Sequence, residues 1–240
     1  MPLVAKQYWK RLSKNFLNLH REATGIDSAE IHGYSFDIFP GVFSPAISSD
    51  TSWFSQQLLP IVKGKSLLEI GTGTGVIACL AKLGGASKVI ATDINPSAVK
   101  NAIHNINKHR LDIFVLQGDM YSPIVRKEKF DIIFWNHPFN YTENKADQQD
   151  DLSFSVFDLQ YASLEKYFHE AKKFLKQGGL LLLGTGSIAR INNIKRISAE
   201  AGFTADLMCK QIVDVSQFHK TKMDVRLYAF SPKADCSVNL

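Results

Sequence analysis

The chain has 240 residues, a formal net charge of +5 and 45% hydrophobic residues, which suits one α/β domain with a modest extension. No apolar run reaches the roughly 18 residues that a membrane span requires, and the first residues lack the apolar core and cleavage site of a secretory signal. Its three cysteines, Cys79, Cys209 and Cys236, are widely spaced without a metal-ligand pattern. The sequence therefore predicts a cytoplasmic protein with no metal and no membrane partner.

The N-terminal region is apolar on one side and basic on the other. Apolar residues recur at near-helical spacing through residues 8–20, which predicts an amphipathic helix docked on the domain. The basic residues of this region are Lys6, Lys10, Arg11, Lys14 and Arg21. Such a cluster is either a solvated helix face, which we favour, or a surface for an acidic partner such as RNA. Residues 34–43 predict a hairpin that turns at Pro40-Gly41.

A glycine-rich stretch follows the next predicted helix, residues 51–62, which Ser49 or Asp50 could cap. Residues 66–70 predict a buried strand and residues 76–83 a helix, and between them lie Gly71, Gly73 and Gly75. A strand that feeds a helix through glycines directs free backbone N–H groups into a crevice, although the glycines could also serve only a tight turn. Their spacing departs from the dinucleotide fingerprint, because Val76 stands where its last glycine belongs. This argues against a dinucleotide-dependent oxidoreductase.

Three more predicted strands end in polar residues. The predicted strands, each given with the polar motif that follows it, are 88–92 with Asp93, 112–116 with Gly118-Asp119, and 130–135 with Asn136-His137-Pro138-Phe139. An acid at the end of the second strand of such a unit can accept hydrogen bonds from ribose hydroxyls.

The remaining elements alternate as in an α/β domain. They are a helix at 96–107 after Asn95-Pro96, a polar loop at 140–151 that shapes access to the site, a helix at 159–175 ended by Gly178-Gly179, a strand at 180–183, a helix at 188–201 ended by Gly202, and strands at 203–215 and 225–230.

Together, these motifs resemble the class I S-adenosylmethionine-dependent methyltransferases. The branch they resemble is the "methyltransferase small" group, which includes release-factor glutamine methyltransferases and ribosomal RNA guanine methyltransferases. The resemblance covers about residues 35–185. It implies a Rossmann-like α/β fold, with a mostly parallel seven-stranded sheet, helices on both faces and 225–230 as an antiparallel last strand. We divide the chain into a helix and hairpin extension at 1–50, a methyltransferase domain at 51–232 and a loose tail at 233–240.

The resemblance also implies how S-adenosylmethionine would bind. Glu69 and the glycines Gly71, Gly73 and Gly75 would approach its methionine part and the ribose side. Asp93 would take the ribose hydroxyls, and Asp119 the adenine amino group with Met120 beside it. In this branch, the segment that corresponds to Thr51 closes over the cofactor. Alternatively, Thr51 only forms the start of a helix.

Asn136, Pro138 and Phe139 are the candidate catalytic residues. The Asn136 side-chain oxygen, with the backbone carbonyl of His137 or Pro138, can accept the two N–H groups of a planar NH2 acceptor. Pro138 stiffens the loop, and Phe139 offers an aromatic face to a flat amide or base. This branch usually has proline where the chain has His137, which puts the exact target in doubt. His137 could alternatively act as a general base.

The resemblance thus implies a SAM-dependent N-methyltransferase that acts on a planar NH2 group. We prefer a protein glutamine side chain as the acceptor. The alternatives are an exocyclic amine of an RNA or DNA base, a small molecule, or a protein that binds the donor without turnover. The roughly 50 residues before the fold are short for the substrate domain of release-factor enzymes, and residues 40–44 also resemble ribosomal RNA guanine methyltransferases. The oligomeric state stays open.

Overall fold

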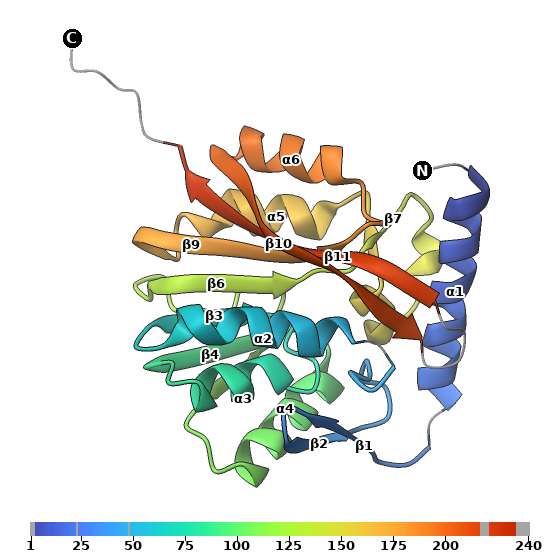
Figure 1. Ribbon diagram of the computed structural model, residues 1–240, viewed down its shortest axis with the longest axis horizontal. Helices are drawn as coiled ribbons and strands as arrows, with labels where there is room; N and C mark the ends of the chain where they lie inside the picture. Colours follow the sequence, from blue (N-terminus) through green and yellow to red (C-terminus); the bar gives the residue numbers. More distant parts are fainter. Residues whose placement is uncertain (1–2, 23, 48, 217–220, 234–240) are drawn as a thin grey trace.

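The computed structural model describes residues 3–22, 24–47, 49–216 and 221–233, and a seven-stranded sheet runs through its middle (Figure 1). The strands stand in the order β10-β11-β9-β6-β3-β4-β5. Their bounds are β3 (Ser66–Ile70), β4 (Lys88–Asp93), β5 (Phe114–Gln117), β6 (Phe130–Asn136), β9 (Leu175–Gly186), β10 (Phe203–Ser216) and β11 (Thr221–Pro232). The strands from β5 to β9 pair in parallel, whereas β11 is antiparallel to β9 and β10. The expected Rossmann-like α/β fold, with an antiparallel strand at 225–230, is confirmed.

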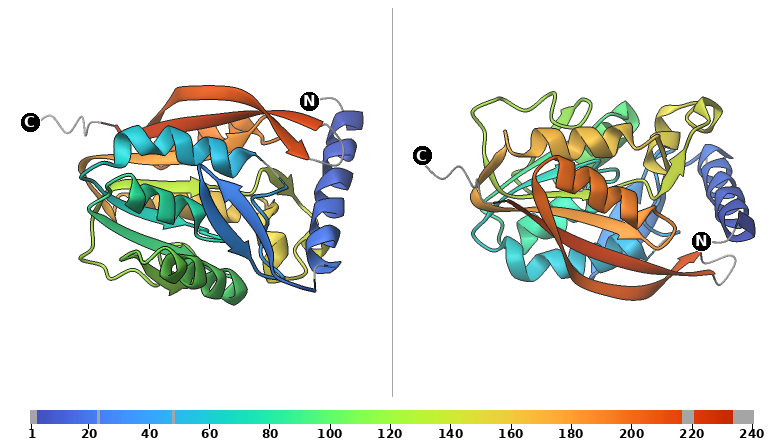
Figure 2. Two further views of the ribbon diagram at one scale, coloured as in Figure 1. Left: turned by 60° about the horizontal axis from the view of Figure 1, so that its bottom comes forward. Right: turned by 90° about the horizontal axis from the view of Figure 1, so that it is seen from above.

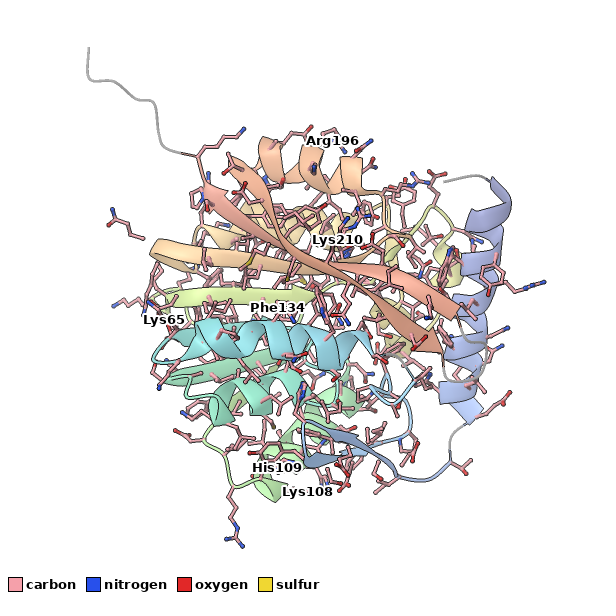
Figure 3. All side chains as sticks on the ribbon, in the orientation of Figure 1. Lys65, Lys108, His109, Phe134, Arg196 and Lys210 are labelled. Atoms are coloured by element: carbon pink, nitrogen blue, oxygen red, sulfur yellow. The ribbon has the colours of Figure 1, made fainter. Side chains whose placement is uncertain are left out.

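The central strands are buried on both faces, and alternate side chains enter two separate cores. Leu67 packs with α2 and α3 on one face, and Leu68 with α5 and α6 on the other. Phe134, labelled in Figure 3, belongs to the first core, where its ring centroid lies 6.0 Å from that of Phe54. The helices are α2 (Asp50–Val62), α3 (Val76–Leu83), α4 (Pro96–Lys108), α5 (Ala162–Ala171) and α6 (Ile191–Glu200). Burial on both faces explains why these strands read as continuous apolar runs.

The chain begins with α1 (Leu3–Glu22), followed by the hairpin of β1 (Asp27–Ile31) and β2 (Tyr34–Ile38). The hairpin turn expected at Pro40-Gly41 is wrong, because the strands reverse at His32-Gly33. His32 and Gly33 have φ values of 51° and 80°, and positive φ at both positions is what a tight two-residue hairpin turn requires. The hairpin is tied to α4, where Lys108 binds Asp37 and His109 binds the Ser35 carbonyl (Figure 3).

α1 stands across the end of the sheet toward which β6 points (Figures 1 and 2). Between it and the sheet, the segment expected as a polar loop at 140–151 has structure of its own. β7 (Asn140–Thr142) and β8 (Phe157–Leu159) form a small parallel sheet, and two 3-10 helices, η1 (Lys145–Asp147) and η2 (Asp151–Ser155), lie between them.

The helix expected at 159–175 is shorter than its sequence indicated. α5 ends at Ala171, and Gly178-Gly179 lie inside β9 rather than after a helix. The pairing of β9 with β6 is irregular there, since Phe130 faces Leu175 and Ile132 faces Leu180. A Cβ on Gly179 would lie 3.0 Å from the Asp131 carbonyl oxygen, so this glycine serves a close strand approach.

None of the helices in the described part of the chain combines the length and apolar character needed to cross a membrane. The division of the chain at residues 50 and 232 stays a prediction. Residues 234–240 of the expected tail, Cys236 among them, lie outside the described residues.

Candidate functional site

A cavity of about 340 Å³ lies at the carboxyl ends of β3, β4, β5 and β6, where α1 forms its outer wall. This volume falls within the range of pockets that hold small ligands. The predicted site residues that line it are Thr51, Glu69, Gly71, Gly73, Asp93, Asp119, Met120, Asn136, Pro138 and Phe139. Motifs that are far apart in the sequence therefore meet at one place. Among the predicted residues, only Gly75 is not part of the lining.

The three glycines of the loop after β3 differ in what surrounds them. All three have positive φ, 65°, 57° and 81° for Gly71, Gly73 and Gly75. A Cβ on Gly71 would lie 3.2 Å from Trp135 Nε1, whereas a Cβ on Gly73 would meet nothing within 4 Å. Gly73 thus leaves open space at the cavity. A Cβ on Gly75 would lie 3.0 Å from the Ala102 Cα, so this glycine lets α3 pack against α4.

Two buried acids lie beside the glycine loop. Asp93 accepts hydrogen bonds from the backbone N–H groups of Gly73, at 2.8 Å, and Asn95, at 2.9 Å, which fix its carboxyl group. Burial raises the pKa of Asp93. Glu69 is 2% exposed and accepts a hydrogen bond from the Thr72 hydroxyl at 2.8 Å. Burial, with a smaller effect of the Asp93 charge, raises the pKa of Glu69 to about 8.

Asp119 also lines the cavity, but it is more exposed than Glu69 and Asp93. Its carboxyl group is half exposed and forms an ion pair with Lys166 at 2.6 Å. Met120, which follows it, is buried and has a φ of 55°, so the chain turns sharply after β5. Sequence reasoning missed Lys166, which comes from α5 and has no signal near the Gly118-Asp119 motif.

The loop after β6 is held by α2. Asn136 Nδ2 donates to Asp50 Oδ2 at 3.0 Å. Asn136 Oδ1 and Asp50 Oδ1 are buried and have no hydrogen-bond partner among the described residues. Ser49 occupies the N-cap position of α2 but makes no side-chain capping bond. Sequence reasoning placed Asp50 with Thr51 in a segment that the resemblance brings over the cofactor and the target pocket, but it named only Thr51 as a candidate contact.

His137 is a buried residue of the cavity lining. Its Nε2 lies 2.8 Å from the Thr185 hydroxyl, and its ring packs against Trp135, Phe139 and Tyr161. Burial lowers the pKa of His137 to about 3. The imidazole is therefore neutral and a weak base at ordinary pH. His137 nevertheless lines the cavity, and its Nδ1 has no hydrogen-bond partner among the described residues.

Ion pairs hold α1 in place at the cavity. Trp9, Ser13 and Phe16 of α1 line the cavity. Lys10 and Lys14 form ion pairs with the buried Asp147 of η1, at 2.6 and 3.0 Å. A more exposed ion pair joins Arg21 to Asp150 at 2.8 Å. Three of the basic residues near the N-terminus thus hold α1 against the segment 140–151, which sequence analysis treated as separate.

Known proteins resemble this chain in both sequence and fold. Residues 33–197 match the family model of the methyltransferase small domain. Over 184 residues, 74% of the chain and 91% of the relative, the sequence is 31% identical to a Methanocaldococcus jannaschii protein named "Putative protein N5-glutamine methyltransferase". It is 28% identical to the release factor glutamine methyltransferase of Bordetella pertussis over 150 residues, 61% of this chain and 55% of that one.

Solved structures share the fold. The Thermus thermophilus 16S rRNA N2 G1207 methyltransferase, in complex with AdoMet and guanosine, superimposes with a TM-score of 0.63 at 18% identity. The alignment covers 87% of this chain and 50% of that one.

Proposed function

Because the chain belongs to the methyltransferase small domain family and is a methyltransferase, we propose that it transfers a methyl group from S-adenosylmethionine to the planar NH2 group of a protein glutamine side chain. The observation that carries the proposal is the unpartnered Asn136 Oδ1, held at the cavity beside the glycine loop. The M. jannaschii relative is named for this reaction.

The residues of the crevice fit the donor. Open space at Gly73 can receive its methionine part, with Glu69 and Gly71 beside it. Asp93, which the Gly73 N–H holds at the cavity, would take the ribose hydroxyls. Asp119 and Met120 would take the adenine, and Thr51 lines the cavity from α2. When bound, S-adenosylmethionine supplies a methyl group activated by a positive sulfonium. A positive sulfonium near Glu69 would favour the ionised form of this carboxyl group, which burial keeps protonated in the donor-free protein.

The composition of the described cavity lining, which has no basic side chain, favours an amide over a nucleotide as acceptor. Five acids line it, namely Asp50, Glu69, Asp93, Asp119 and Asp151. The described residues of the lining include no lysine or arginine. Nucleic acid recognition relies on basic contacts to phosphates, and three basic residues of α1 are already occupied by ion pairs. A neutral primary amide needs no cationic partner.

The loop after β6 would position the amide for direct displacement. Asn136 Oδ1 accepts one N–H, which turns the nitrogen lone pair toward the donor methyl group. Pro138 limits the freedom of the loop, and the Phe139 ring offers a flat surface to the amide. Holding both reactants in line accounts for much of the acceleration that a methyltransferase needs.

The proposal is tested with methyl-labelled S-adenosylmethionine, the purified protein and a cell extract, divided afterwards between protease and nuclease. We expect label that survives nuclease and is released by protease. Label that nuclease releases would overturn the glutamine proposal in favour of a base in RNA or DNA. A label in small molecules alone would overturn it in favour of a small acceptor.

A further inference from the structure

We propose that the edge of the sheet opposite the cavity binds the phosphate backbone of a nucleic acid. This inference does not depend on the proposed function, because the surface lies apart from the cavity. The parallel strands β4, β3, β6 and β9 are neighbours in the sheet, so their amino ends share one edge. The cavity lies at the other edge, where β3, β4 and β6 end. In Figure 3, Lys65 lies at the end of the sheet away from α1.

Basic side chains gather where these four strands begin. Residues 63–65 precede β3, residues 85–88 lead into β4, residues 126–131 lead into β6, and residues 172–176 lead into β9. The four segments hold two acids, Glu128 and Asp131. They also hold nine basic residues, here called the basic edge, which are Lys63, Lys65, Lys88, Arg126, Lys127, Lys129, Lys172, Lys173 and Lys176.

Hydrogen bonds between the segments hold them side by side. The Lys65 carbonyl accepts the Ser87 N–H at 2.9 Å, and Lys129 Nζ donates to the Lys173 carbonyl. Asp131 joins β6 to β3, because its carboxylate accepts the Ser66 N–H at 2.8 Å. Since neighbouring strands lie about 4.8 Å apart, the basic edge extends about 15 Å across the four strands. The nine residues therefore lie in one band.

Most of the positive charge of the basic edge is not balanced by acids. Eight of its nine residues are exposed, and Lys88 is partly exposed. Among the described residues, its only ion pairs are Lys88 with Glu128 at 2.7 Å and Lys176 with Asp131 at 2.8 Å. Nine positive and two negative side chains leave an excess of seven positive charges, whereas the whole chain has a net charge of +5. The rest of the chain is therefore slightly acidic.

A band of this kind fits a chain of phosphates. Lysine and arginine contacts to phosphates supply the sequence-independent part of nucleic acid binding. An anionic lipid surface is bound instead by basic residues together with exposed tryptophan, phenylalanine or leucine side chains. The large apolar residues of the four segments, Phe130, Phe174 and Leu175, are all buried. We therefore expect backbone binding without sequence preference.

The basic edge differs from the basic cluster near the N-terminus, which is the other candidate surface for RNA. Lys10, Lys14 and Arg21 of that cluster are held in ion pairs with acids of the segment 140–151. Seven of the nine residues of the basic edge have no ion pair within the described part of the chain. A nucleic acid bound at the basic edge also leaves the cavity open, so the protein can hold a nucleic acid and an acceptor together.

The test measures binding of a fluorescent single-stranded oligouridine by anisotropy at several salt concentrations. The edge variant combines Lys65→Gln, Arg126→Gln and Lys127→Gln, which remove three exposed charges without ion pairs in the described structure. The control variant removes three exposed charges from α4, α6 and β10, and combines Lys100→Gln, Lys195→Gln and Lys210→Gln. The two variants have the same net charge, so they differ only in where the charge is lost.

We expect the Kd of the edge variant to rise at least about tenfold at low salt, and that of the control variant to stay within about twofold of the wild type. Each phosphate contact contributes about −0.7 to the slope of log K against log salt, so three lost contacts should make the slope shallower by about 2. An equal loss of affinity in the control variant would overturn the inference, because net charge alone would then explain binding. Absence of binding by the wild type at low salt would overturn it as well.

Further measurements identify the ligand class and the surface. Phosphatidylserine vesicles and polyglutamate are offered to the wild type, and tighter binding of either than of oligouridine would overturn a nucleic acid as the partner. In an NMR titration with oligouridine, backbone amide shifts should fall on residues 63–65, 126–131 and 172–176. Shifts confined to the cavity residues would refute the assignment of this edge. None of these measurements requires methyl transfer, so failure of the proposed function and failure of this inference are told apart.

Discussion

Glu69→Gln tests the electrostatics of the donor crevice. Glu69 is fully enclosed, and its pKa rises from 4.5 to about 8, mainly through burial. The folded protein therefore keeps the proton on this carboxyl group over a range in which the unfolded chain releases it. Glutamine preserves the shape and an oxygen that can accept the Thr72 hydroxyl, but it cannot titrate.

The direction and the magnitude of the stability change follow from the pKa values of Glu69 in the unfolded and the folded protein. Because the folded-state pKa is the higher one, the contribution of Glu69 to stability is complete below the unfolded pKa of 4.5 and is lost as pH rises through about 8. Between about pH 6 and about pH 8, this loss amounts to about 2 kcal/mol. We expect the free energy of unfolding of the wild type, relative to Glu69→Gln, to fall by about that amount over the same interval.

The assay is urea denaturation of both proteins across this pH range without donor. Taking the difference between wild type and variant cancels the titration of other groups. The exposed Glu165→Gln serves as the control for loss of a surface acid. A difference between wild type and Glu69→Gln that does not change with pH would refute the reasoning, because it would mean that Glu69 is ionised in the folded protein.

Three further substitutions separate binding, transfer and packing. Asn136→Ala should keep donor affinity while transfer falls at least about tenfold, and unchanged transfer in a kinetic assay would contradict its role. Asp93→Ala should weaken donor binding by about 1–3 kcal/mol in calorimetry, and unaltered affinity would remove Asp93 from the donor site. Gly75→Ala should lower the free energy of unfolding by about 2–4 kcal/mol, since its new Cβ would meet Ala102 at positive φ, whereas Gly33→Ala has positive φ without a contact and should cost less. Equal losses in the two glycine variants would refute the packing argument.

Local features of the sequence predict the centre of the fold well. Strands buried on both faces are mostly apolar, and glycines at positive φ mark where β3 meets α3. Because the ends of parallel strands share one edge of the sheet, the motif residues could be expected to meet. The cavity brings together Glu69, Asp93 and Asn136 as that argument predicts.

Contacts between distant side chains could not be predicted in the same way. Asp50 meets Asn136 only because α2 is packed beside β6, and Asp147 meets Lys10 only because α1 lies across the sheet end. Neither pair has a local pattern in the sequence. The hairpin turn was misplaced because Pro40-Gly41 is a stronger turn signal than His32-Gly33, where the strands reverse.

The most direct test of the central claim is to identify the atom that receives the methyl group. Protein that the enzyme has labelled with methyl-labelled S-adenosylmethionine is digested, and the labelled peptide is sequenced by mass spectrometry. The account predicts one added methyl group on a glutamine side-chain nitrogen, absent with Asn136→Ala. A methyl group on another side chain, or on a nucleobase recovered from the same extract, would contradict it.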